Sequence, residues 1–119
     1  MNICDIQSTE NYLRLESLDY FLENPNQIYM QMPTIKLVMV DNEFFKYFAL
    51  DGNNRLYVAY KLELNNVPFI EKKFDKRRKK HRKFYRFALQ NRADGIKSWD
   101  DLEDYIINSE EYHDLSRFP

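Results

Sequence analysis

Ten of the fifteen residues from Lys72 to Arg86 are lysine or arginine, and the only acid among them is Asp75. The segment therefore has a net charge of +9, and because the whole chain carries −1, the remaining residues together carry −10. Lys and Arg side chains are almost never fully buried without a partner. Any fold open to this chain must therefore place a concentrated positive patch on a moderately acidic body.

The rest of the composition supports a single domain over residues 1–119. Of the 119 residues, 44% are hydrophobic and 16% are aromatic, which is enough for a core rich in rings. A disordered chain has few such residues. The lone cysteine, Cys4, excludes an internal disulfide and argues against a disulfide-stapled secreted domain.

The chain also lacks the features of a secreted or membrane protein. Its first residues have neither the basic nor the apolar region of a signal peptide. The longest apolar stretches, such as residues 44–50, are far too short to span a bilayer. We therefore expect a cytoplasmic protein that has no membrane partner, and host cytoplasm if the protein is viral.

Hydrophobic spacing predicts an N-terminal helix followed by strands. Residues 8–24 have apolar residues at helical spacing, with Ser8 as the N-cap and Asn24–Pro25 as the stop signal. Residues 55–64 alternate, which predicts a half-buried strand paired as a hairpin across the turn at 51–54. The other predicted strands are residues 27–32, 34–41 and 43–50.

Two helices are predicted after a boundary loop at residues 65–68. The first covers residues 75–93, with Gly95 as its C′ residue, and the second follows Ser98 as its N-cap. The apolar stripe of the second helix is Trp99, Leu102, Tyr105, Ile106 and then Tyr112. The predicted fold is therefore α+β, with an N-terminal helix, an antiparallel sheet of three to four strands, and two C-terminal helices packed on one face.

Several kinds of chemistry are excluded. The only glycines, Gly52 and Gly95, are explained as turn residues, so the chain has no Gly-rich phosphate loop. One cysteine and two histidines, His81 and His113, are too few and too scattered for a zinc site. The acids between residues 100 and 111 are interpreted as a solvated helix face. We predict no metal, no cofactor, no catalytic residue and no enzymatic activity.

On a helical wheel the basic segment has two faces. The inward stripe is Phe74, Arg77, His81, Phe84 and Ala88. The outward stripe is Lys76, Lys79, Lys83 and Arg86, with Arg82 adjacent. His81 is interpreted as a neutral boundary histidine, because neighbouring cations favour its uncharged form. Like charges one turn apart cost roughly 0.2–0.5 kcal/mol per pair, so something that bears negative charge must offset the outward stripe.

Three sources of negative charge fit this requirement. The first is nucleic-acid phosphate, because aromatic residues lie beside the cations and the stripe has the length for backbone contacts. The second is a partner protein with an acidic surface. The third is the chain itself, since residues 94–114 contain eight acids and one base, Lys97. That acidic segment directly follows the basic helix and is placed to fold back beside it.

The predicted order of a helix, three strands and a helix that opens with Lys and Arg resembles the double-stranded-RNA-binding domain. In that family, basic residues at the start of the second helix contact phosphates across the major groove. The matching segment here is Lys79–Lys83. The Gly-Pro and His elements of the family's inter-strand loops are absent, the alanine-rich helix face is reduced to Ala88 and Ala93, and a third helix is added. We therefore assign the chain to no family.

The favoured hypothesis is a small non-enzymatic nucleic-acid-binding or regulatory protein that contacts the phosphates of DNA or RNA without reading sequence. The predicted contact residues are Lys76, Arg78, Lys79, Lys80, Arg82, Lys83 and Arg86. The alternative is a protein–protein interaction module, an inhibitor or adaptor, whose basic helix or aromatic sheet face binds an acidic partner. The Asn-, Lys-, Tyr- and Phe-rich composition is common in AT-rich genomes, including phage genomes, and fits either hypothesis.

Overall fold

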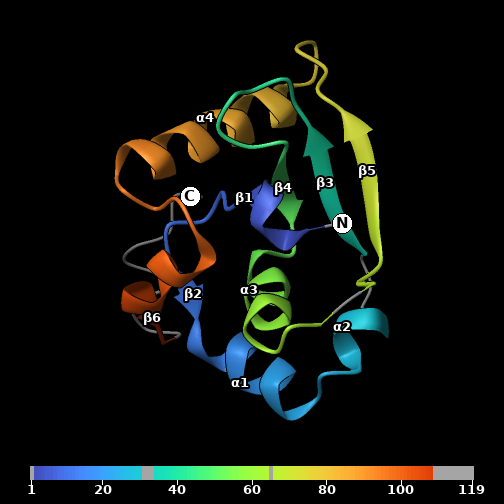
Figure 1. Cartoon of the computed structure of the whole chain (residues 1–119), viewed down its shortest axis with the longest axis vertical. Coiled ribbons are helices and arrows are strands. Elements are labelled where there is room, and N and C mark those ends of the chain that lie inside the picture. Colours follow the sequence, from blue (N-terminus) through green and yellow to red (C-terminus); the bar gives the residue numbers. More distant parts are fainter. Residues whose placement is uncertain (1, 31–33, 65, 109–119) are drawn as a thin grey trace.

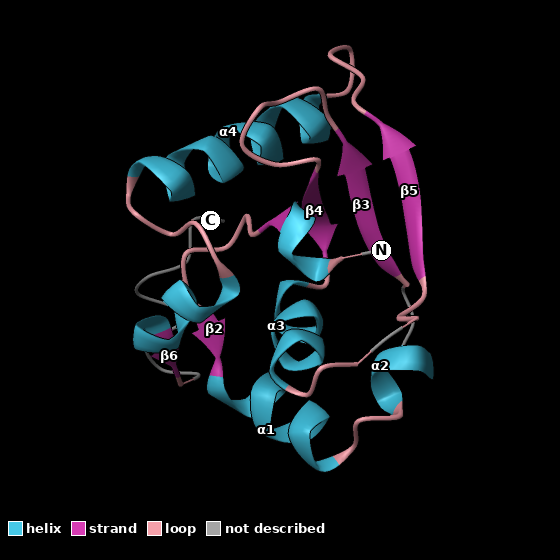
Figure 2. Ribbon diagram, viewed as in Figure 1, coloured by secondary structure: helices cyan, strands magenta, loops and turns pink. Residues whose placement is uncertain are grey.

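A computed structural model describes residues 2–30, 34–64 and 66–108. Helices and short strands are interspersed along the chain (Figures 1 and 2). The elements are η1 (Ile3–Asp5), β1 (Ile6–Gln7), β2 (Leu13–Arg14), α1 (Leu15–Glu23), α2 (Gln27–Met30), β3 (Ile35–Met39), β4 (Tyr47–Asp51), α3 (Asn53–Lys61), β5 (Phe69–Lys73), α4 (Lys79–Ala93), η2 (Trp99–Tyr105) and β6 (Ile106–Ile107). The α+β class is confirmed.

The main sheet is mixed rather than antiparallel. Its strand order is β1-β4-β3-β5, in which only β3 and β4 pair antiparallel, while β1 with β4 and β3 with β5 are parallel. A second, two-stranded sheet joins β2 and β6. The antiparallel prediction is wrong because the long connection between β3 and β5, which contains β4 and α3, brings β5 back beside β3 in the same direction.

Helices cover both faces of the main sheet, so the prediction of packing on one face is also wrong. Leu37 and Val38 are neighbours in β3 and point to opposite faces. Leu37 belongs to a core cluster with residues of α1, α3 and η2, whereas Val38 belongs to a second cluster with Phe84 and Ala88 of α4. Burial on both faces explains why the sequence of β3 is almost entirely apolar instead of alternating.

Two predicted strands are helices. Residues 55–64 fall largely within α3, which begins after Gly52 at φ 95°, a conformation that favours glycine. All residues from Leu56 to Ala59 are buried, so α3 has no polar face to mark a helical period. Residues 27–30 form α2, and residues 31–33 lie outside the described residues. With α3 in place of the third strand, the element order that suggested the double-stranded-RNA-binding domain is lost.

The N-terminal helix is shorter than predicted. It begins at Leu15 rather than after Ser8, because Ser8 and Thr9 are buried and bonded to distant parts of the fold. Thr9 Oγ1 donates to the Ala49 carbonyl at 2.7 Å, and Asn91 Nδ2 donates to the Ser8 carbonyl at 3.1 Å. The stretch before α1 is therefore a buried polar segment, not a helix.

The last predicted helix is a short 3-10 helix, and its N-cap is the predicted residue. Ser98 and Asp101 form a capping box at the start of η2, and Trp99 and Leu102 are buried as predicted. The rest of the predicted stripe is wrong, since Tyr105 and Ile106 are exposed and Ile107 of β6 is buried instead. The chain leaves the helix at Tyr105 because residues 106–107 pair with β2. The prediction for Tyr112 lies outside the described residues.

Candidate nucleic-acid interface

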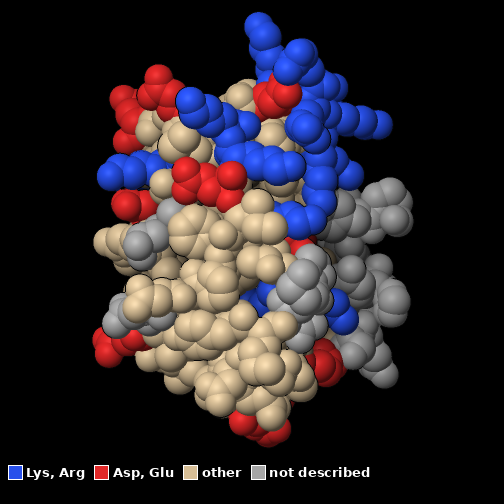
Figure 3. All heavy atoms as spheres, turned by 90° about the vertical axis from the view of Figure 1, so that its right-hand side faces the viewer, with Lys and Arg blue, Asp and Glu red and all other residues tan. Residues whose placement is uncertain are grey.

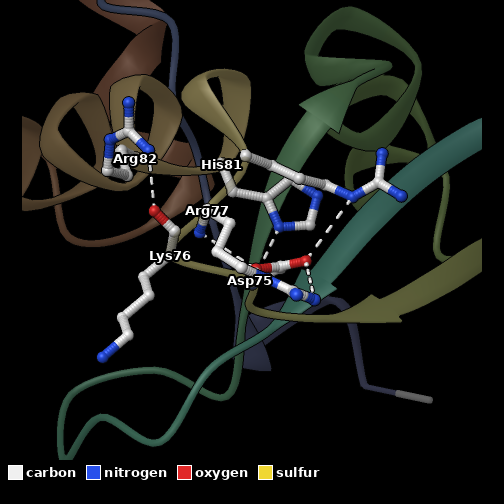
Figure 4. A network of polar contacts seen from close by, with 6 residues as sticks. Asp75, Lys76, Arg77, His81 and Arg82 are labelled. Atoms are coloured by element: carbon white, nitrogen blue, oxygen red, sulfur yellow. Dashed lines mark hydrogen bonds and ion pairs between the residues drawn. The ribbon is translucent and has the colours of Figure 1, made fainter.

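The basic segment is divided among three elements rather than lying on one helix. Lys72 and Lys73 end strand β5, residues 74–78 form a turn, and α4 begins at Lys79. The prediction of a helix from residue 75 is wrong because Asp75 organises the turn. Its Oδ1 accepts from the backbone N–H of Arg77 at 2.9 Å, as in an Asx turn, and its carbonyl accepts from the N–H of Arg78 at 3.0 Å (Figure 4).

Two residues of the predicted stripes are displaced by this turn. Arg77 does not face inward: its side chain is 87% exposed and pairs with Asp75 at 3.1 Å. Lys76 is not on the helix, so the outward stripe on α4 consists of Lys79, Lys83 and Arg86. The turn is still attached to the helix, because Arg82 Nη1 donates to the Lys76 carbonyl at 2.7 Å (Figure 4).

The inward face of α4 is confirmed at its centre. His81, Phe84 and Ala88 are buried. The His81 ring lies 6.2 Å from the Phe74 ring, and the cluster that contains Phe84 and Ala88 packs on Val38 and Phe48 of the sheet. The pKa of His81 is lowered by burial and then by the positive charge of Arg78, so the ring is neutral near pH 7.

The basic side chains gather at one end of the molecule. We define the basic surface as the cations of β5, of the turn and of the first two turns of α4, and Figure 3 shows Lys and Arg atoms gathered at that end of the molecule. Its members are Lys72, Lys73, Lys76, Arg77, Arg78, Lys79, Lys80, Arg82, Lys83 and Arg86. It contains every predicted contact residue, brought together from the turn and the helix.

The acids nearest in the sequence do not neutralise this surface within the described residues. Among these residues, Asp75 forms ion pairs with Arg77 and Arg78 only. Asp100 and Glu103 of η2 instead pair with Lys61 of α3, and Asp101 accepts from the backbone of Lys97 and Ser98. In the described part of the chain, seven cations of the basic surface have no carboxylate oxygen within 4.0 Å: Lys72, Lys73, Lys76, Lys79, Lys80, Arg82 and Arg86.

A groove opens where the start of α4 meets the sheet, and it adds residues that the sequence reasoning missed. It has a volume of about 660 Å³ and is lined by Lys36, Leu37, Leu50, Ile70, Lys72, Arg78, Lys79, Lys80 and His81. Lys36 is far from the basic segment in the sequence, and only the pairing of β3 with β5 brings it there. No hydrophobic or charge pattern in the sequence signals that contact.

Comparison with protein-family models, with curated proteins and with solved structures finds no match to this chain. Within residues 2–30, 34–64 and 66–108, no cluster of three His, Cys, Asp or Glu side chains is arranged to hold a metal ion. The described helices are also too short or too polar to cross a membrane. The site therefore has to be interpreted from its own charges and contacts.

Proposed function

We propose that the protein binds nucleic acid, without enzymatic activity, by placing the basic surface against the sugar-phosphate backbone. The observation that carries the proposal is the group of seven cations that have no carboxylate partner among the described residues. Cations so arranged attract a polyanion and gain free energy when it releases its condensed counterions. The contacts are to phosphates, so the binding is independent of sequence.

The shape of the basic surface also favours a polyanion over a single acidic side chain. Lys73 ends β5, Lys76 lies in the turn, and Arg86 lies two helical turns into α4. At 1.5 Å per residue, the helical part from Lys79 to Arg86 alone runs for about 10 Å, which spans more than one phosphate of a nucleic-acid strand. An acidic partner protein is the second candidate, and binding that survives nuclease treatment would identify it.

Salt-dependent binding tests the proposal. Fluorescence anisotropy of labelled single-stranded DNA, double-stranded DNA and double-stranded RNA should show binding at 50 mM salt. If about four phosphates are contacted, affinity falls roughly a hundredfold between 50 and 200 mM salt. No binding of any of the three at 50 mM salt would refute the proposal.

A matched pair of variants locates the contact. Lys79→Gln with Arg86→Gln removes two cations of the basic surface, whereas Lys46→Gln with Lys97→Gln removes two exposed cations elsewhere. Both changes alter net charge equally. The first pair should weaken binding about a hundredfold near 0.1 M salt and lower the salt slope by about two, because each lost phosphate contact is worth about tenfold there. Equal losses in both pairs would place the binding outside the basic surface.

A further inference from the structure

The groove between the start of α4 and the sheet has a cationic lining whose charges come from three elements. Lys36 lies on β3, Lys72 on β5, and Arg78, Lys79 and Lys80 at the start of α4. None of the described residues that line it is acidic. Among the described residues, Arg78 is the only one of these five with a carboxylate partner, Asp75 at 3.8 Å. A cleft lined by charges of one sign concentrates the electrostatic potential inside it.

The floor of the groove is formed by the face of the sheet on which α4 packs. In the register of β3 with β5, Lys36 pairs with Ile70 and Val38 pairs with Lys72. Alternate residues of a strand share a face, so Lys36 and Lys72 lie on the face of Val38, whose cluster includes Phe84 and Ala88 of α4. The sheet therefore presents two ammonium groups, with the apolar side chain of Ile70 beside them, next to the first turn of α4.

The wall of the groove is a helix N-terminus without a cap. α4 is 15 residues long, its N-cap residue is Arg78, and no side chain in the described chain caps its first turn. The first turn contains no acid. The N–H groups there have no partner within the helix, and the helix dipole makes this end partially positive. Cations occupy the end of the helix where an anion is stabilising.

His81 supplies an independent observation that points to a ligand. The residue is only 3% exposed, and its ring lines the groove. Its Nδ1 accepts from the backbone N–H of Asp75 at 3.1 Å, with the second ring nitrogen turned away from that bond (Figure 4). In a neutral imidazole that accepts at Nδ1, the proton is on Nε2. Within the part of the chain that the structure describes, Nε2–H has no protein acceptor and is not a fully buried atom, so it is accessible to a ligand in the groove.

We propose that the groove is a phosphate-binding subsite that seats one phosphoryl group. Its oxygens accept hydrogen bonds from His81 Nε2–H and from the backbone N–H groups of the first turn of α4. The ammonium groups of Lys36, Lys72 and Lys79 balance its charge. One phosphoryl group thereby satisfies the unpaired donor, the uncapped helix end and the unneutralised lysines together.

The volume of the groove indicates a nucleotide unit rather than an isolated ion. About 660 Å³ is within the range of roughly 300–1,000 Å³ typical of small-molecule sites. Leu50 and Ile70 add apolar lining beside the cations, which suits a ribose or base next to the seated phosphate. That the phosphate belongs to a nucleic-acid strand rests on the proposed function, whereas the subsite itself does not.

Nuclear magnetic resonance of the full chain tests the subsite directly. Imidazole and backbone ¹⁵N resonances are followed while inorganic phosphate, adenosine monophosphate or a short single-stranded oligonucleotide is added. We expect His81 Nε2 and the amides of Lys72 and Lys79 to shift together at millimolar phosphate, with larger shifts for the nucleotide. Absence of a shift at His81 with all three ligands would overturn the proposal.

Two variants separate the subsite from the rest of the basic surface. His81→Asn keeps an acceptor for the Asp75 N–H and removes the Nε2–H donor, so phosphate affinity should fall about tenfold. Lys36→Gln changes a half-buried floor residue and should also weaken phosphate binding, whereas Lys46→Gln outside the groove should not. If His81→Asn does not fold, the phosphate affinity of Lys36→Gln alone tests the subsite.

The two proposals fail in different ways. If oligonucleotides bind and lose affinity in the Lys79→Gln/Arg86→Gln variant, but are unaffected by His81→Asn and Lys36→Gln, the subsite is wrong and the proposed function stands. If inorganic phosphate or the nucleotide shifts His81 while no oligonucleotide binds at 50 mM salt, the subsite stands. Its ligand is then a small phosphorylated molecule, and the proposed function is wrong.

Discussion

At one end of the molecule, Lys61 of α3 lies between Asp100 and Glu103 of η2, and the hydroxyls of Tyr60 and Tyr57 donate to the same two carboxylates. At the other end, Asp75 forms ion pairs with two arginines of the basic surface. We call the first group the acidic region. Its charged groups have partners within the fold, whereas seven cations of the basic surface have no carboxylate partner among the described residues. That difference separates charges that stabilise the fold from charges available for binding.

The contacts that hold α4 against the rest of the fold include a buried neutral anchor, Asn91. Asn91 is fully buried, and its Nδ2 donates to the carbonyls of Ser8 and Glu10. Asn91→Ala should therefore lower the free energy of unfolding by about 3 kcal/mol, because it leaves buried carbonyls without donors. Urea denaturation measures this. Gln90→Ala, on the exposed side, should cost less than about 0.5 kcal/mol, and equal costs would show that Asn91 is not the anchor.

An acid at the start of α4 should improve folding and damage binding. In Lys79→Glu, the new carboxylate lies at the positive end of the helix dipole and relieves repulsion, so the free energy of unfolding should rise by about 0.5 kcal/mol. Affinity for oligonucleotides should fall by more than about tenfold. Thermal denaturation and anisotropy measure the two effects, with Lys97→Glu as the control. Destabilisation by Lys79→Glu would show that this lysine serves the fold.

The free energy of unfolding should fall in alkali, because of Tyr57 in the acidic region. Burial, and then the charge of Glu103, raise the pKa of Tyr57 to about 12. An unfolded tyrosine loses its proton near pH 10, so Tyr57 contributes stability that is present below pH 10 and is lost as the pH rises toward 12. Denaturation between pH 9 and 11 should show this loss, and Tyr57→Phe should reduce it. An unchanged slope in Tyr57→Phe would contradict the assignment.

The free energy of unfolding should fall in acid, because His81 beside the basic surface becomes protonated. Burial and the charge of Arg78 lower the pKa of His81 below its ordinary value, so the unfolded chain takes up the proton first as the pH falls. The contribution of His81 is therefore complete above the unfolded pKa of about 6.5 and is lost as the pH falls below it. Denaturation at pH 7.5 and 5.5 measures the loss. His81→Asn should have a smaller loss, whereas a larger one would show that a different group titrates.

The sequence predicted the parts of this arrangement that depend on local spacing. Helical spacing correctly placed His81, Phe84 and Ala88 on the buried face of α4, and the Ser98 cap was also correct. Alternation failed at residues 55–64, because a helix buried on most of its surface loses its helical period. Where the neighbouring residues in the sequence are all apolar, their spacing does not distinguish a helix from a strand.

The rest of the candidate site depends on topology rather than on local pattern. All five residues of β5 are exposed, so no alternation marks this strand, which is placed by its register with β3. That register brings Lys36 and Lys72 to the same face. The Asx turn at Asp75 then ends the strand and begins the helix four residues late. Parallel pairing across a helical crossover leaves no short-range trace in a single sequence.

The position of β5 at the end of the main sheet has a consequence for how copies of this protein meet. A terminal strand exposes unpaired N–H and C=O groups on which another chain can add its own strand. Lys72 and Lys73 occupy that strand, so two copies approaching edge to edge would bring like charges together. The lysines of the proposed binding surface would therefore also oppose self-assembly at this edge, and replacing them with neutral residues should favour aggregation.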